Sequence, residues 1–157
     1  FENYGLPVVM LRYFTVYGSR QRPDMAFHKF IKAMLKGKLI HIYGEGSQMR
    51  DFTHVEDVVE ATILAMECED DNILGEPINI GSSSPVKLID AVNLMADIIG
   101  VEPQIIFEPP KKGDVKITYA DITKARKLLN WKPKTKLRKG LEKEIEWLKG
   151  IIRLKMT

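Results

Sequence analysis

Short apolar runs alternate along the chain with stretches in which apolar residues recur at helical spacing. The runs predict strands at about residues 6–14, 39–43, 50–55, 77–81 and 104–107. The periodic stretches predict helices at about residues 24–37, 56–66, 87–99, 122–129 and 138–154. The first run lacks alternation, which is typical of a parallel strand buried on both faces. Strands alternating with helices predict an α/β fold.

The predicted strands are too few and too short for a complete doubly wound sheet with helices on both faces. Residue 1 is Phe rather than Met, which fits either a processed start or a piece of a longer chain. We therefore expect an incomplete α/β domain. Asp24 and Asp121 each precede a predicted helix and are candidate N-caps.

Composition narrows the class of protein. Of 157 residues, 45% are hydrophobic and 29% charged, the formal net charge is +3, and Cys68 is the single cysteine. No apolar run approaches the roughly 18 residues that span a bilayer, and a chain without disulfides fits a cytoplasmic enzyme. The basic stretch 124–139 is better explained as a solvated helix face than as a nucleic-acid site. The spacing of the three histidines does not predict a metal site.

Cationic side chains occur in several separate predicted loops. Arg20 and Arg22 follow the first strand, Arg50 begins another, and Lys111 and Lys112 lie in a Pro/Gly-rich loop. Such groups can converge on a diphosphate, although the residues alone favour the interpretation that each is a surface charge. The aromatic rings at positions 27 and 43 can sandwich a planar base, or they can be ordinary core and strand residues.

Seven short motifs follow one another in a characteristic order. They are LRYFTVYG at 11–18, RPDMA at 22–26, RDFTHVEDV at 50–58, NIG at 79–81, KGDV at 112–115, YADITKA at 119–125 and LNWKP at 129–133. Together they resemble the carboxy-terminal part of the extended short-chain dehydrogenases that act as nucleotide-sugar epimerases and dehydratases. The likeness covers essentially the whole chain and is greatest to UDP-glucuronate and UDP-glucose 4-epimerases.

The resemblance implies a fold made of the last strands and helices of a Rossmann-type sheet plus a small C-terminal substrate-binding α/β domain. On this basis residues 1–18 and 51–84 would be remnants of the sheet, and residues 19–50 and 85–157 the substrate-binding part. The chain contains neither the Gly-rich NAD loop nor the Tyr-x-x-x-Lys pair of the family. We therefore expect no catalytic residue here, and only weak binding of NAD to this chain alone.

The resemblance also implies binding roles for matched positions. Tyr13 and Phe14 would lie beside the nicotinamide of NAD, and Thr15 would approach the sugar. Arg22 would face the C6 carboxylate of UDP-glucuronate, or would only brace its loop in a UDP-glucose enzyme. The uridine diphosphate would meet a larger set: Ala26, Phe27, His41, Tyr43, Arg50 and Lys111. Lys111 stands where relatives carry Arg, so it keeps the charge and loses the bidentate fork.

Two functions remain open at this point. One is the sugar-nucleotide-binding half of an NAD-dependent UDP-sugar 4-epimerase, or of a nucleotide-sugar dehydratase, inactive by itself. The other is a non-catalytic sugar-nucleotide-binding or interaction module, or a truncated gene product. Expected partners are a UDP-sugar, a second copy in a homodimer or larger oligomer, and a separate N-terminal half.

Overall fold

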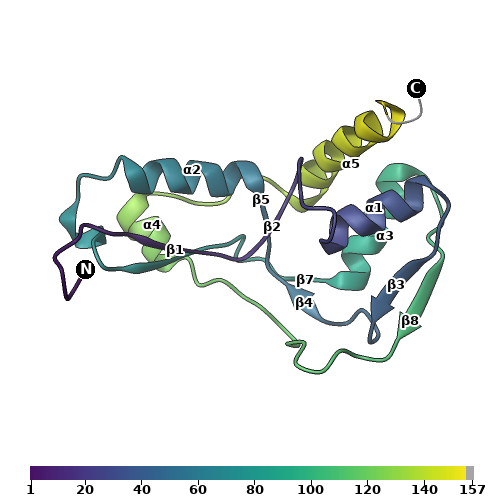
Figure 1. Cartoon of the computed structure of the whole chain (residues 1–157), viewed down its shortest axis with the longest axis horizontal. Helices are drawn as coiled ribbons and strands as arrows, with labels where there is room; N and C mark the ends of the chain where they lie inside the picture. The colour runs from purple at the N-terminus through teal and green to yellow at the C-terminus, as the bar shows by residue number, and fades with distance from the viewer. Residues whose placement is uncertain (155–157) are drawn as a thin grey trace.

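The computed structural model describes residues 1–154 as an elongated α/β assembly with two lobes (Figure 1). The strands are β1 (Met10–Tyr13), β2 (Thr15–Tyr17), β3 (Ile40–Tyr43), β4 (Met49–Arg50), β5 (Phe52–His54), β6 (Pro77–Ile80), β7 (Val86–Lys87) and β8 (Ile105–Glu108). The helices are α1 (Ala26–Leu35), α2 (Val55–Met66), the 3-10 turn η1 (Asp71–Ile73), α3 (Leu88–Ile99), α4 (Thr123–Leu129) and α5 (Leu137–Leu154). The predicted α/β class is confirmed.

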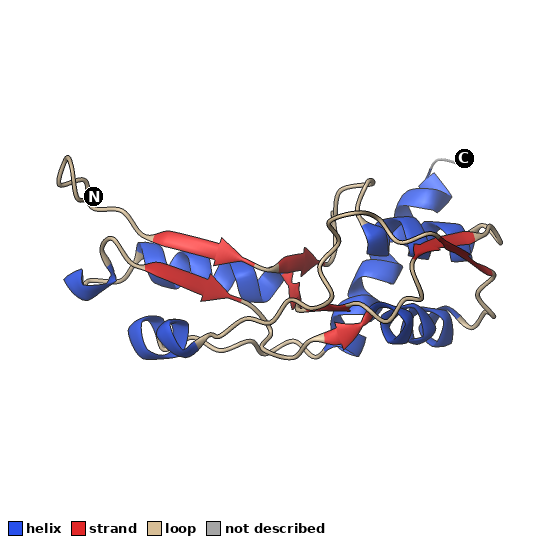
Figure 2. Cartoon of the chain, turned by 90° about the horizontal axis from the view of Figure 1, so that it is seen from below, coloured by secondary structure: helices blue, strands red, loops and turns tan. Residues whose placement is uncertain are grey.

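The first lobe consists of β1, β6, α2 and α4, and we call it the open lobe. β1 and β6 pair in parallel, with Met10 opposite Pro77 and Tyr13 opposite Ile80. One face of this pair packs on α2 and α4 through a cluster that includes Ile80, Ala61 and Trp131. The second edge of β1 has no strand beside it among the described residues (Figure 2).

The second lobe consists of α1, β3, α3, β8 and α5, and we call it the closed lobe. β3 pairs in parallel with β8, and the three helices pack against one another beside this pair. Its core contains Phe27, Ile31, Met95 and Ile145, each at most 2% exposed. The helical spacing of apolar residues in α1, α3 and α5 is what brings these side chains to one centre.

Two short strand pairs join the lobes, β2 with β5 in parallel and β4 with β7 in antiparallel. Asp51 lies between β4 and β5 and is fully buried. Its carboxylate accepts backbone hydrogen bonds from Ser82 at 2.6 Å, Ser83 at 3.0 Å and Ala120 at 2.9 Å. A buried carboxylate without these donors would be strongly destabilised, so the three bonds fix the loops that leave β6 and enter α4.

The first strand differs from its prediction. We expected a strand over residues 6–14 buried on both faces, but β1 is short, and Met10 and Tyr13 are 47% and 48% exposed. The reason is that β6 covers one edge and the helices one face, which leaves the other edge and face of β1 uncovered. The uncovered surface is the expected consequence of an incomplete sheet.

Three further local predictions are corrected. The strand predicted over 50–55 is split into β4 and β5, because Asp51 turns inward to its backbone donors. The cap of α1 is not Asp24, whose carboxylate pairs with Arg22 at 3.0 Å. Instead the side chain of Gln21 accepts from His28 N in the first turn at 3.0 Å. Asp121 accepts from Thr123 N at 2.9 Å, but α4 begins at Thr123 and its N-cap position is Ile122, one residue after the predicted one.

The predicted division of the chain at residues 18, 50 and 84 stays a prediction, and one element packs differently from it. α4 lies in the range 85–157, yet Ala125 and Leu129 pack with α2 and β6 in the open lobe. Within residues 1–154, no helix is both long and apolar enough to cross a membrane.

Candidate functional site

Two adjoining pockets open where the lobes meet. The larger is a cavity of about 680 Å³ bordered by β1, β2 and the loop after β2, including Tyr13, Phe14, Thr15 and Arg22. The smaller is a cavity of about 290 Å³ between β3, α1 and β4. Thr15 lines both pockets. The larger pocket lies at the carboxyl ends of β1 and β2, the usual position of ligands in parallel sheets.

The smaller pocket brings together residues that are far apart in the sequence. Ala26 from α1, His41 and Tyr43 from β3, and Arg50 from β4 all line it. β3 alternates between buried and exposed side chains, so His41 and Tyr43 point to the same exposed face while Ile40 and Ile42 enter the core. The pocket thus combines an aromatic ring with a fixed cation.

Arg50 is held in place from two directions. Its side chain donates to the Met49 carbonyl at 2.8 Å and forms an ion pair with Asp114. The Arg50 side chain is 16% exposed, so its charge acts in a partly desolvated setting where electrostatic interactions are stronger. A guanidinium oriented in this way is suited to bind an anion such as a phosphate at the mouth of the pocket.

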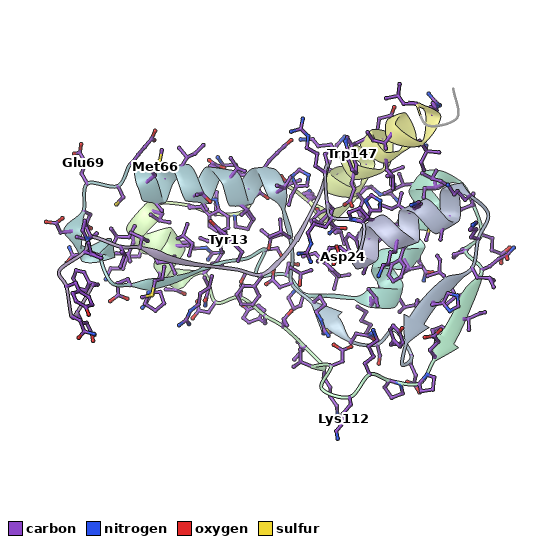
Figure 3. The ribbon with its side chains drawn as sticks, in the orientation of Figure 1. Tyr13, Asp24, Met66, Glu69, Lys112 and Trp147 are labelled. Atoms are coloured by element: carbon purple, nitrogen blue, oxygen red, sulfur yellow. The ribbon has the colours of Figure 1, made fainter. Side chains whose placement is uncertain are left out.

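Lys111 contacts the aromatic ring of the same pocket. Its ammonium nitrogen lies 4.0 Å from the centre of the Tyr43 ring, which is the geometry of a cation–π contact. Tyr43 remains 38% exposed, so part of the ring is accessible to a planar ligand. Lys112, the next residue, points away from the ribbon into solvent (Figure 3).

His41 has a partner on the neighbouring strand. Its Nδ1 lies 2.6 Å from Glu108 Oε1 of β8, and both side chains are partly exposed. The contact fixes the imidazole at the edge of the pocket. Residues 1–154 contain no group of three or more His, Cys, Asp or Glu side chains that could hold a metal ion, so the described part of the chain offers no metal centre.

Comparison with known proteins places the chain in a family. The sequence model of the NAD dependent epimerase/dehydratase family matches residues 1–81, more than half of the 157 residues. The chain belongs to this family. An uncharacterized UDP-glucose epimerase of Bacillus subtilis (strain 168) is 41% identical over 150 residues, which are 96% of this chain and 47% of that protein. A UDP-glucuronate 4-epimerase of Thermodesulfobacterium geofontis is 40% identical and is covered over 46% of its length.

Solved structures give the same assignment. The UDP-glucuronic acid 4-epimerase of Bacillus cereus, crystallised with UDP-glucuronic acid and NAD, matches with a TM-score of 0.92 at 44% identity. The match covers 96% of this chain and 48% of that chain. The UDP-glucose 4-epimerase of Thermotoga maritima with UDP-glucose matches at 0.89 and 37% identity, over 48% of its chain. The chain thus spans about half the length of the relatives it matches.

NAD is the cofactor of complete enzymes in this epimerase/dehydratase family. In this chain the residues that fit a nicotinamide are the half-exposed ring of Tyr13 and the neighbouring Phe14, both at the larger pocket. The Tyr13 hydroxyl bonds the hydroxyl of Thr62 on α2 at 2.9 Å, which fixes the ring. No Gly-x-Gly-x-x-Gly, the motif that binds the phosphates of NAD, occurs in the sequence.

Phe27 was predicted to face a base, and the structure places its ring elsewhere. Phe27 is 1% exposed and packs in the closed lobe, with ring centres 4.3 Å from Phe52 and 5.5 Å from Tyr17. A ring buried in this way cannot stack on a ligand, so the core alternative left open by the sequence is correct for Phe27. Its neighbour Ala26 lines the smaller pocket because successive helical residues face different directions.

Arg22 lines the larger pocket, whereas its partner Asp24 lines the smaller one. Its guanidinium pairs with Asp24 at 3.0 Å, and both side chains are well exposed. An exposed pair of this kind is weak, so Arg22 is free to exchange Asp24 for an anionic ligand.

Sequence reasoning missed three acidic residues around the site. Asp114 holds Arg50, Asp51 holds the neighbouring loops, and Glu144 accepts a hydrogen bond from Gly18 N at 3.0 Å. Asp114 and Asp51 lie inside two of the quoted motifs. The motifs therefore indicated that these residues matter, but not which groups they bind. Glu144 lies on the inward face of a helix between Leu141 and Ile145, and a charged residue on an apolar face was the available signal.

Proposed function

We propose that this chain is the sugar-nucleotide-binding part of an NAD-dependent UDP-sugar 4-epimerase. The observation that carries the proposal is the smaller pocket, where Tyr43 and Arg50 offer an aromatic ring and a cation beside Thr15, and where Lys111 lies over the Tyr43 ring as a second cation. The aromatic ring suits a uridine base, and the two cations suit a diphosphate. The names of the relatives, UDP-glucose and UDP-glucuronate epimerases, support the same ligand class.

The test is calorimetric titration of UDP into the wild-type chain and into Arg50→Ala. We expect Arg50→Ala to weaken binding by roughly tenfold or more, because a charge-assisted hydrogen bond to phosphate is lost. Arg138→Ala is the matched control, since Arg138 forms an exposed ion pair with Asp97 and lines neither of the two pockets. Equal UDP affinity in wild type and Arg50→Ala would remove the diphosphate assignment.

We infer that the larger pocket takes the sugar, with Thr15 at its entrance and Arg22 at its rim. A cation at the rim favours a glucuronate, whose C6 carboxylate can replace Asp24 on Arg22. Titration with UDP-glucuronate and with UDP-glucose separates the two substrates. A preference for UDP-glucuronate that disappears in Arg22→Gln supports the glucuronate enzyme, and equal affinities support the glucose enzyme.

Turnover is expected to need a second polypeptide segment. The sequence lacks the Tyr-x-x-x-Lys pair, and the relatives are about twice as long as the matched part. The uncovered edge of β1 supports a missing sheet neighbour. The purified 157-residue chain should therefore bind UDP without epimerising UDP-sugars and without binding NAD tightly, and epimerisation by this chain alone would refute the proposal.

A non-catalytic binding module is the second candidate, and it shares the same pocket. The two differ in what happens when the other half of a relative is supplied. We expect co-expression with the N-terminal half of the Bacillus subtilis relative to give a complex that binds NAD. A chain that binds UDP but never forms such a complex would favour the module.

A further inference from the structure

Glu144 reaches the rim of the sugar pocket from the far end of the chain. It lies on α5, is fully buried, and its Oε2 accepts from Gly18 N at 3.0 Å. Its other oxygen, Oε1, has no hydrogen-bond partner among the described residues. Gly18 is the first residue of the loop 18–22 that borders the larger pocket. The C-terminal helix and the proposed substrate loop are therefore joined directly.

The position of α5 is set by a close approach one turn earlier. At Gly140 a Cβ atom would collide with the Tyr17 hydroxyl and would lie 2.7 Å from the His54 ring. Only glycine lets α5 come this close to β2 and β5. Residue 144 follows residue 140 by four positions and lies on the same face of the helix. The close contact at Gly140 thus fixes the position of the Glu144 carboxylate.

The loop 18–22 needs such a fixed point because its backbone is unusual. Gly18 has φ +131° and Arg20, a non-glycine residue, has φ +68°. The far end is held by Gln21, whose side chain donates to Val16 O and accepts from His28 N. At the near end, Glu144 is the side chain that holds Gly18 N. Arg22, which we assign to the sugar, is the last residue of this loop.

Among residues 1–154, Glu144 forms no ion pair with a cation. The titratable groups on the elements packed around it include Tyr17 of β2, His28 of α1, His54 of β5 and Asp57 of α2. Burial lowers the pKa of His54 and, with the nearby carboxylates, raises the pKa of Tyr17, so His54 and Tyr17 are both neutral near pH 7. Burial raises the pKa of Glu144 to about 7, against the smaller opposite effect of the Gly18 bond.

We propose that Glu144 is a positioning residue for the substrate loop: its carboxylate on α5 holds Gly18 and thereby sets where Arg22 stands at the sugar pocket. The proposal rests on the proposed function, because it takes Arg22 as the residue that meets the sugar. The ionised carboxylate is the stronger acceptor for Gly18 N, and protonation weakens the bond. Substrate binding is accordingly coupled to the protonation of a group that does not touch the substrate.

The first test follows the backbone amide of Gly18 by nuclear magnetic resonance while pH is varied. In the wild-type chain the Gly18 amide proton should shift with a midpoint within about one unit of pH 7. Glu144→Gln should abolish this titration while keeping an accepted hydrogen bond, and Glu142→Gln, a neighbouring exposed carboxylate, should leave it unchanged. A Gly18 amide shift that does not change with pH in the wild-type chain would show that Glu144 does not hold Gly18. This outcome would overturn the proposal even if Glu144→Ala fails to fold.

The second test measures affinity for UDP-glucuronate and for UDP. Glu144→Ala should lose roughly tenfold in affinity for UDP-glucuronate and about twofold or less for UDP, because the UDP pocket is built from other residues. Wild-type affinity for UDP-glucuronate should fall from about pH 8 to about pH 6, and that of Glu144→Gln should not. Unchanged UDP-glucuronate binding in Glu144→Ala overturns the positioning role, whereas no UDP-sugar binding by the wild type overturns the proposed function instead.

Discussion

The open and closed lobes use similar apolar side chains and bury them to different extents. Met95 on α3 in the closed lobe is 0% exposed, whereas Met66 on α2 in the open lobe is 77% exposed and points away from the ribbon (Figure 3). Val59 and Ile63 on the same helix are 51% and 44% exposed. The closed lobe surrounds its core with three helices, while the open lobe covers one face of a two-stranded sheet.

The difference shows where the molecule leaves the apolar side chains of a helix exposed. A globular chain normally buries apolar surface of this extent, and an exposed stretch of it marks a contact site. The chain spans about half the length of its relatives, and we propose that a further protein segment packs on the open lobe. The closed lobe carries most of the proposed UDP pocket.

The comparison between the lobes predicts its largest effect on stability for methionine, which occurs on a helix of each lobe. Met95→Ala removes a fully buried side chain and should lower the free energy of unfolding by about 2–5 kcal/mol. Met66→Ala removes an exposed one and should change it by less than about 0.5 kcal/mol. Urea denaturation measures both, and equal losses would mean that α2 is covered in solution.

Substitution of Asp51 tests whether the stability of both lobes depends on this one residue between them. Asp51→Asn keeps the shape but offers one acceptor oxygen to three backbone donors, so we expect a loss of about 2–4 kcal/mol. Asp97→Asn, in an exposed pair with Arg138, should cost less than about 0.5 kcal/mol. Separate unfolding transitions for the two lobes in Asp51→Asn would show that this carboxylate couples them, and a small loss would contradict its role.

The sequence predicted the closed lobe better than the open lobe for a physical reason. Helical spacing in α1, α3 and α5 reports burial directly, since these helices pack within the chain. The same reasoning failed for β1, because a run of apolar residues predicts a buried strand whether or not the described chain supplies the neighbours that would cover it. Local caps were also misassigned: Gln21 reaches α1 through a loop conformation that spacing does not reveal.

The site could be predicted as a set of residues but not as a geometry. The family resemblance predicted binding roles for Tyr43, Arg50 and Lys111. The structure places Tyr43 and Arg50 in one pocket and Lys111 over the Tyr43 ring. Phe27 shows the limit, because adjacent residues of a helix point into a pocket and into the core. Glu144 lies 126 positions from Gly18, and a contact of that span follows only from the fold.

The buried charge of the closed lobe predicts a dependence of stability on pH. The folded pKa of Glu144 is about 7 and its ordinary value is 4.5, so the folded state holds a proton that the unfolded state releases between these values. The free energy of unfolding should therefore fall as pH rises through this window, by up to about 1.4 kcal/mol per unit. Denaturation at several pH values should show that Glu144→Gln removes this slope, and Glu60→Gln in the open lobe should retain it.

The exposed surface of the open lobe predicts self-association of the isolated chain. Introducing charge through the double change Val59→Lys and Met66→Lys should lower the association measured by sedimentation, with less than about 0.5 kcal/mol change in stability. The corresponding surface change in the closed lobe, Phe107→Lys, removes one exposed ring and should have little effect. A wild-type chain that sediments as a compact monomer at all concentrations would contradict the open-lobe interpretation.

The smallest effect concerns affinity at the pocket of the closed lobe. Lys111 reaches the Tyr43 ring as a point charge, and an arginine there can stack on the ring and also fork onto two phosphate oxygens. Lys111→Arg should therefore tighten UDP binding by about threefold, measured by calorimetry. Lys112→Arg is the matched control, because Lys112 points into solvent and should leave the affinity unchanged. If both variants bind UDP like the wild type, the loop at 109–114 does not close on the ligand, and Arg50 alone provides the charge that the diphosphate meets.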